Sequence, residues 1–166
     1  MIERDASSLY FGDLGAVPPE QLVTHMNDPR VAAHLPLLTR RWTVDDAVAF
    51  QAAKAQRWLE DGLGHWAIHA GDRYVGWGGF EKEGAVWDFG LVLTAEAFGL
   101  GRRVFLKALD FARQDDRIDR ISVLLAPSRK HLSALTRYGA EFVGEDEHAG
   151  QRFLRYELTP SKSPGQ

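Results

Sequence analysis

The chain has 166 residues, of which 45% are hydrophobic and 26% charged, the composition of one globular domain. It contains no cysteine, which excludes disulfide bridges, cysteine-ligated zinc and a cysteine nucleophile. The formal net charge of −3 argues against a nucleic-acid partner. The N-terminus lacks a basic-then-apolar leader, and no long apolar run is present, so we expect a cytoplasmic protein with no membrane partner.

We expect residues 1–158 to form a single domain. Residues 159–166, with the sequence Thr-Pro-Ser-Lys-Ser-Pro-Gly-Gln, contain no large apolar side chain to bury. Such a segment cannot offset the entropy of ordering, so we expect it to be a disordered tail.

The first predicted elements are short. A strand is expected over 9–11, and a helix that opens at Pro18-Pro19 is expected to run to about Met26. Asp28-Pro29 then starts a second short helix over 30–34. These elements place helical structure before most of the sheet.

A longer helix follows, with clear signals at both ends. Thr43 is a candidate N-cap, Asp46 stands three residues later as in a capping box, and Gly62 is placed to end the helix. Apolar residues recur at helical spacing, which predicts an apolar stripe formed by Val48, Ala52, Ala55 and Leu59.

The middle of the chain changes to strand periodicity. Two strands over 65–70 and 74–80 are joined by a tight turn at Gly71-Asp72, and a third strand is expected over 86–93. The last third alternates helix and strand: a helix from Gly101 to about Gln114, a strand over 121–125, a helix from Ser128 to Gly139, and strands over about 142–145 and 152–158. This order predicts a mixed sheet with helices on both faces.

The segment Gly99-Leu100-Gly101-Arg102-Arg103 carries the strongest functional signal, because it opens a helix shortly after the strand over 86–93. The glycines let a ligand approach the backbone, and the first helical turn offers N–H groups and a positive dipole end. Arg102 and Arg103 lie in that turn, where cations oppose the dipole unless an anion is bound or the side chains extend into water. The pattern favours a phosphate or pyrophosphate site.

Two phosphate-binding motifs fit poorly. A dinucleotide fold requires G-x-G-x-x-G directly after a strand, whereas Val104 takes the third glycine position and a five-residue loop, 94–98, intervenes. A P-loop motif is absent from the sequence.

The sequence resembles the GNAT superfamily of acyl-CoA-dependent N-acyltransferases over about residues 20–158, and most closely its RimJ/RimL-like branch. The resemblance rests on the segments 27–32, 88–93, 98–102 and 135–144. The pyrophosphate loop of the family follows [QR]-x-x-G-x-[GA]. Gly99 and Gly101 match this pattern, and Glu96 stands where Gln or Arg is usual.

The resemblance implies an α/β fold of the α+β type, with a mostly antiparallel sheet of six to seven strands. It also implies a V-shaped opening between the strands over 86–93 and 121–125. Pantetheine would pair there with the backbone of the first strand, and the pyrophosphate would bind the N–H groups of the following loop. The implied cofactor-binding residues are Leu91, Val92, Leu93, Phe98, Gly99, Leu100, Gly101, Arg102, Arg103, Ser128 and His131.

Amide formation from a thioester needs an oxyanion donor and a base for the ammonium group. The resemblance implies backbone N–H groups near Val92–Leu93 as the donor and Asp88 as the catalytic base. Glu81 and Glu83 border the same region and are interpreted as solvated charges after a strand. No metal site is expected, since His65 and His69 on one strand are about 13 Å apart.

The sequence therefore predicts direct acetyl transfer from acetyl-CoA to a primary amine, with a peptide or protein N-terminus favoured on resemblance. A small amine such as a polyamine, amino acid or antibiotic is the alternative acceptor. A non-catalytic acyl-CoA-binding or sensory domain, and a nucleotide-binding protein that uses the same helix start, remain open. The resemblance also makes a homodimer possible.

Overall fold

The computed structural model describes residue 5 and residues 7–127 and 133–162. In this part of the chain, seven strands form one sheet in the order β1-β2-β3-β4-β5-β7-β6. The strands are β1 (Leu9–Gly12), β2 (His65–Ala70), β3 (Arg73–Glu83), β4 (Val86–Leu93), β5 (Ile121–Leu125), β6 (Glu141–His148) and β7 (Gln151–Leu158). All neighbours pair antiparallel except β4 and β5, which are parallel. The predicted sheet is confirmed.

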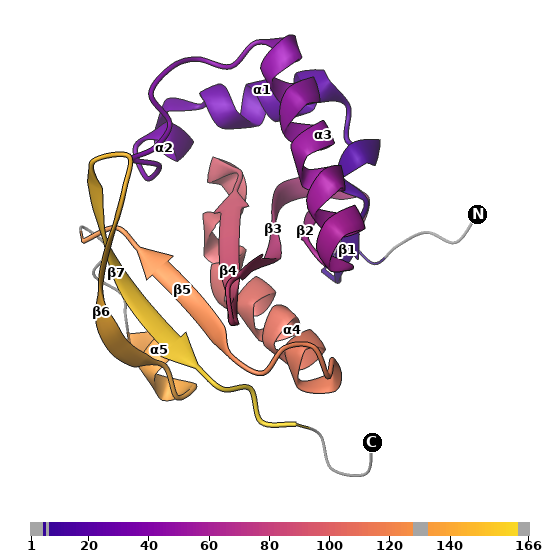
Figure 1. Cartoon of the computed structure of the whole chain (residues 1–166). Coiled ribbons are helices and arrows are strands. Elements are labelled where there is room, and N and C mark those ends of the chain that lie inside the picture. The colour runs from indigo at the N-terminus through magenta and orange to yellow at the C-terminus, as the bar shows by residue number, and fades with distance from the viewer. Residues whose placement is uncertain (1–4, 6, 128–132, 163–166) are drawn as a thin grey trace.

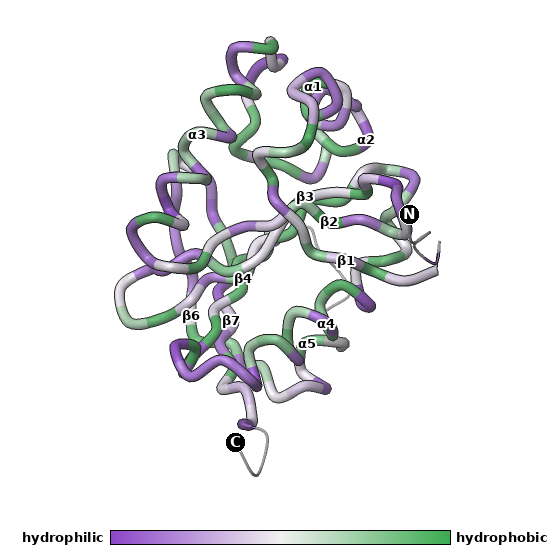
Figure 2. The backbone as a smooth tube through the Cα atoms, turned by 90° about the vertical axis from the view of Figure 1, so that its right-hand side faces the viewer, coloured by the Kyte–Doolittle hydropathy of each residue, from purple (hydrophilic) through white to green (hydrophobic). Residues whose placement is uncertain are grey.

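Helices cover both faces of the sheet (Figures 1 and 2). One face carries α1 (Pro19–Asn27), α2 (Pro29–Ala32) and α3 (Val44–Asp61), and the other carries α4 (Gly101–Gln114) and α5 (Ser133–Arg137). Two 3-10 helices, η1 (Leu14–Ala16) and η2 (Ala95–Leu100), precede α1 and α4. Leu22 and Ala47 pack in the first layer, and Phe105 and Leu109 in the second.

The ends of α3 follow their local signals. Thr43 and Asp46 make both bonds of the capping box, and Gly62 ends the helix in the left-handed region with φ 75°. A side-chain N-cap of this kind stabilises a helix by about 1 kcal/mol. The boundaries of α3 are thus set within its own sequence.

The face of α3 that meets the sheet differs from the prediction. Val48 and Leu59 are 50% and 80% exposed, and Ala52 and Ala55 are exposed as well, so the predicted stripe faces solvent. The covered face instead carries Ala47, Phe50, Gln51, Lys54 and Trp58. Polar residues are tolerated there because they find partners: Gln51, for example, donates to the carbonyls of Leu14 and Val17.

The strands β4 and β5 diverge, as the resemblance implies. Their register contains only the pairs Trp87↔Ile121 and Asp88↔Ser122, after which the strands separate (Figure 1). On its other edge β5 pairs with β7 along its whole length. Within the described residues, the edge of β4 from 89 to 93 therefore has no strand beside it on the β5 side, and a V-shaped opening begins at Asp88.

On the side of β4 away from the opening, the strands β3 and β4 lie unusually close together. Gly76 and Gly78 of β3 lie so close to β4 that an added Cβ atom would collide with the carbonyl oxygens of Val92 and Gly90. Gly76 also has a φ of 152°, which favours glycine. The glycines of β3 therefore allow the close approach of two backbones that fixes β4 in position.

The segment after β7 packs against the end of α4. Pro160 is buried, and the Nζ atom of Lys162 donates to the carbonyls of Ala112, Asp115 and Ile118. Residues 163–166 of the expected tail lie outside the described residues. No helix in the described part of the chain is long and apolar enough to cross a membrane.

Candidate active site

The C-terminal end of β4 leads through η2 directly into α4. The N–H group of Thr94 donates to the carbonyl of Val75 at 2.8 Å, which anchors the start of the loop to β3. Leu100 at the N-cap of α4 makes no side-chain capping bond. A Cβ atom on Gly99 would meet nothing within 4 Å, and one on Gly101 would meet only Leu93 Cδ1 at 3.8 Å. The space beside both glycines is therefore open, while the N–H group of Gly101 itself donates to the carbonyl of Phe98.

The two arginines at this helix start are both engaged. Arg102 donates to the hydroxyl of Tyr138 at 3.3 Å, and Arg103 donates to the carbonyl of Ser7. Their positive charge thus stays beside the first turn of α4, where the helix dipole by itself favours anions. Such a concentration of positive potential suits a pyrophosphate.

Glu96 and Phe98 connect this loop to α2. Arg30 of α2 bridges Glu96 and Asp28, with both N–O distances at 2.7 Å; Arg30 and Glu96 are exposed, and Asp28 is partly buried. The backbone N–H of Glu96 itself and Arg30 lower the pKa of Glu96. The ring of His34 also contacts Phe98, with centroids 5.5 Å apart. Glu96, the residue that departs from the [QR]-x-x-G-x-[GA] pattern, is thus a carboxylate that forms an ion pair with Arg30 of α2.

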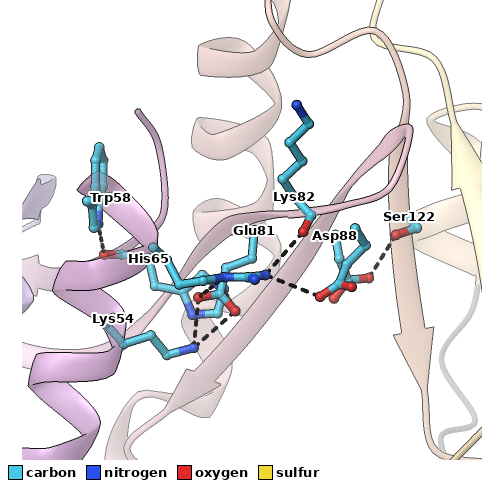
Figure 3. A network of polar contacts seen from close by, with 9 residues as sticks. Lys54, Trp58, His65, Glu81, Lys82, Asp88 and Ser122 are labelled. Atoms are coloured by element: carbon cyan, nitrogen blue, oxygen red, sulfur yellow. Dashed lines mark hydrogen bonds and ion pairs between the residues drawn. The ribbon is translucent and has the colours of Figure 1, made fainter. Parts of the chain in front are cut away.

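Asp88 lies where β4 and β5 begin to separate. The hydroxyl of Ser122 donates to Asp88 Oδ1 at 2.8 Å (Figure 3). Burial raises the pKa of Asp88 to about 6, Glu81 and Glu83 act in the same direction, and the Ser122 bond and Arg155 oppose it. A carboxylate with a pKa near neutrality can accept a proton from a substrate and release it again.

The β3 side of Asp88 is lined by an ion-pair network (Figure 3). Glu81 is the cross-strand partner of Asp88. Lys54 of α3 donates to both carboxylate oxygens of Glu81 at 3.1 Å. Arg57 lies 3.6 Å from Glu81 and 3.3 Å from Glu83. The interpretation of Glu81 as a solvated charge is wrong, because β3 extends to Glu83 and α3 covers Glu81, whose side chain is 17% exposed.

His65 lies beneath this network. Its ring lies against Gly90, whose added Cβ would be 3.3 Å from Cε1, and its Nε2 is 3.8 Å from Glu81. Burial, and then Lys54 and Arg57, lower the pKa of His65 well below its usual value, so the ring is neutral. His65 therefore adds no positive charge beside Asp88.

A second ion-pair network lines the β7 side. Glu157 accepts from Arg120 and from Arg155, both at 2.9 Å, and Arg155 also donates to Asp146 at 3.0 Å. Asp88 thus lies between two sets of charges that are already paired.

The structure brings together most of the residues predicted for the site. Leu91, Val92 and Leu93 lie on the free edge of β4, with Asp88 at one end and the segment 98–103 at the other. Ser128 and His131 lie outside the described residues. Sequence reasoning missed Lys54, Arg57 and His65, which lie far from β4 in the sequence. The one available signal was the i, i+3 spacing of Lys54 and Arg57 on one helix face.

Comparison with solved structures identifies the class of fold. No family model matches the sequence, and the comparison with curated proteins finds no match. A protein from Bordetella pertussis described as a GnaT-family acetyltransferase superposes with a TM-score of 0.71 at 15% identity, covering 91% of this chain and 95% of that one. The chain therefore has the GNAT acetyltransferase fold.

Two further structures have the same fold. Spermidine N-acetyltransferase from Vibrio cholerae, solved with CoA and spermine, gives a TM-score of 0.71 at 14% identity and covers 94% of this chain and 98% of that one. The N-acetyltransferase PseH from Campylobacter jejuni, solved with acetyl coenzyme A, gives 0.63 at 13% identity, with 92% and 99% covered. At these identities the likeness establishes the fold.

Proposed function

We propose that the protein is an acetyl-CoA-dependent N-acetyltransferase that transfers the acetyl group directly to a primary amine. The observation that carries the proposal is the geometry of β4. Its free edge joins a partly buried carboxylate, Asp88, to an open helix start at Gly99–Gly101. The similar structures solved with CoA or acetyl-CoA support the same cosubstrate.

In this mechanism the free edge of β4 orients the cosubstrate. Backbone groups of Leu91 and Leu93 would pair with pantetheine as a neighbouring strand does. The N–H groups between Phe98 and Arg103 would bind the pyrophosphate. Acetyl-CoA, when bound, supplies the activated acetyl group, and the backbone N–H groups near Val92 would stabilise the oxyanion.

Asp88 would remove the proton from the attacking ammonium group, directly or through one water. With its pKa raised by burial to about 6, it is ionised at neutral pH and still basic enough to share a proton. Ser122 holds Oδ1 in a fixed direction. Since the chain has no cysteine, transfer proceeds in a ternary complex with no thioester formed on a protein thiol.

We place the chain in the RimJ/RimL-like branch, with a peptide N-terminus as acceptor, on the strength of the segment 27–32 and the late helix before Gly139. In the structure the first segment spans the end of α1 and α2, beside the site, where Arg30 bonds Glu96. Residues 1–158 would form the catalytic domain.

The test is release of free CoA thiol from acetyl-CoA in the presence of amines, with the acetylated product identified by mass spectrometry. Thermal-shift measurements with acetyl-CoA, ATP and NAD accompany it. Of these three ligands, we expect only acetyl-CoA to stabilise the fold. We also expect at least one class of amine to be acetylated. Stabilisation by acetyl-CoA without turnover of any amine would favour an acyl-CoA-binding domain, and stabilisation by ATP or NAD instead would favour a nucleotide-binding protein.

A further inference from the structure

The carboxylates around Asp88 are already neutralised by cations of the protein itself. Glu81 is paired with Lys54 and Arg57, and Glu83 is paired with Arg57. On the other side the same holds for Glu157 and Asp146, whose partners are Arg120 and Arg155. Of the carboxylates that the structure describes on β3, β4 and β7, Asp88 alone has no cation within 4.0 Å, and its direct partner is the Ser122 hydroxyl. Glu141 of β6, the cross-strand neighbour of Glu157, is exposed to solvent.

Lys54 occupies the kind of position in which a protein would hold a substrate ammonium group. Its Nζ atom lies 5.4 Å from the ring centre of Phe50 and 5.3 Å from that of Trp77, and it contacts Glu81. Two aromatic faces and a carboxylate are the groups that bind ammonium ions. The side chain of Lys54 is 16% exposed, so this subsite is filled by the protein.

We infer that the acceptor is a primary amine that carries a single positive charge, and that Lys54 is a specificity-determining residue that excludes polyamines. The inference rests on the proposed function and names its acceptor class. The single ammonium group of such an acceptor finds one unpaired carboxylate, Asp88. A second ammonium group would meet carboxylates that are already paired, beside the positive charges of Lys54 and Arg57. The site thus discriminates against polyamines because Lys54 and Arg57 repel a second ammonium group and no free carboxylate of β3, β4 or β7 is left to bind it.

Two matched sets of amines test this inference. The first is butylamine, 1,4-diaminobutane and spermidine, which add ammonium groups to one alkyl scaffold. The second is a peptide whose only cation is its α-ammonium group and the same peptide with two added lysines. The measured quantity is kcat/KM from CoA thiol release at saturating acetyl-CoA. We expect the singly charged member of a set to exceed the most highly charged one by about tenfold or more.

The variant Lys54→Met frees part of the Glu81 carboxylate and should raise the spermidine to butylamine ratio of kcat/KM about tenfold, because a site for a second ammonium group opens. Arg57→Gln is the second variant, in case the first fails to fold. Lys107→Met is the matched control, because Lys107 also contacts an aromatic ring, Phe11 at 5.3 Å, but lies on α4. It should leave the ratio unchanged.

A wild-type preference for the polycationic members, or an unchanged ratio in folded Lys54→Met and Arg57→Gln, would overturn the inference while the acetyltransferase assignment stands. Turnover of none of these amines by a protein that binds acetyl-CoA would overturn the proposed function, and the acceptor class with it.

Discussion

The two ends of β4 contrast in how they are built. At the C-terminal end, the loop from Gly99 to Arg103 presents backbone, and an added Cβ on either glycine would meet at most one atom within 4 Å. At the N-terminal end, Asp88 accepts from Ser122 of β5 and lies between ion pairs that join α3 to β3 on one side and Arg120 to β7 on the other. The first end is local in sequence, and the second is assembled from distant segments.

Under the proposed function, the contrast separates cosubstrate binding at one end of β4 from acetyl transfer at the other. Main-chain N–H groups at a helix start can bind an anion whatever side chains surround them, so under the proposed function that end would tolerate a departure such as Glu96. A carboxylate that must titrate near neutrality depends on its surroundings: burial, Ser122 and the neighbouring charges together set the pKa of Asp88. Changes at the two ends should therefore affect different measured quantities.

The largest expected effect is on turnover at the Asp88 end. Asp88→Asn should lower kcat by about 10²- to 10⁴-fold, because the proton acceptor is lost while the Ser122 hydrogen bond can persist. In the wild type, kcat/KM should fall as the pH drops below about 6, the pKa to which burial raises Asp88, and the variant should lack this limb. Affinity for acetyl-CoA should stay unchanged in a calorimetric titration.

Glu83→Gln is the matched control for this substitution, because Glu83 is on the same strand pair but its side chain is 61% exposed. It should retain nearly full activity. A wild-type rate for Asp88→Asn across the pH range would remove Asp88 from the mechanism.

At the other end, Gly101→Phe should weaken acetyl-CoA binding by about 100-fold, because a bulky side chain blocks the approach of the pyrophosphate to the backbone. The fold should persist, since Gly101 has helical φ and ψ of −53° and −46° and its Cβ would make only an ordinary contact with Leu93. Gly101→Ala is the smaller-volume control. Calorimetric titration and thermal melting measure both effects, and unchanged affinity in Gly101→Phe would contradict the loop assignment.

The ionised carboxylate of Asp88 should also lower the free energy of unfolding. Its folded pKa of about 6 is above the usual 3.8, so the ionised folded form is disfavoured. The cost, up to about 3 kcal/mol, is present above pH 6 and disappears as the pH falls from 6 towards 4. Asp88→Asn should therefore raise the free energy of unfolding in urea at pH 8 and leave it almost unchanged at pH 4. Equal effects at the two pH values would show that Asp88 titrates normally.

The smallest effect is expected at Glu96. Glu96→Gln removes a negative charge beside the proposed pyrophosphate site and leaves Arg30 paired with Asp28 alone, so affinity for CoA should rise a few-fold. The gain should shrink as salt is added. Weaker CoA binding by the variant would show that the Arg30–Glu96 pair holds the loop in its binding shape.

Much of the fold was predictable because its signals are local. The capping box at Thr43, the left-handed Gly62 and the period-2 pattern of 86–93 each define an element without reference to the rest of the chain. The divergence of β4 from β5 was predictable through the family resemblance, since strand separation leaves no mark on composition or periodicity.

The face of α3 and the charges around Asp88 were beyond sequence reasoning. The stripe from Val48 to Leu59 has helical spacing, but Lys54 and Arg57 turn to the sheet because Glu81 and Glu83 lie opposite. Such a choice depends on pairing between residues some 27 positions apart, which periodicity does not encode. The open space beside Gly99 and Gly101 was predictable because it depends on consecutive residues, and the pyrophosphate that we propose for it stays a prediction.

The most direct test of the pyrophosphate site is a titration of ¹⁵N-labelled protein with CoA and, separately, with pantetheine, which lacks the pyrophosphate. We expect the amide signals of Gly99, Gly101 and Arg102 to shift with CoA and to stay in place with pantetheine, while those of Leu91 and Leu93 shift with both. Unperturbed Gly99 and Gly101 amides at saturating CoA would contradict the account.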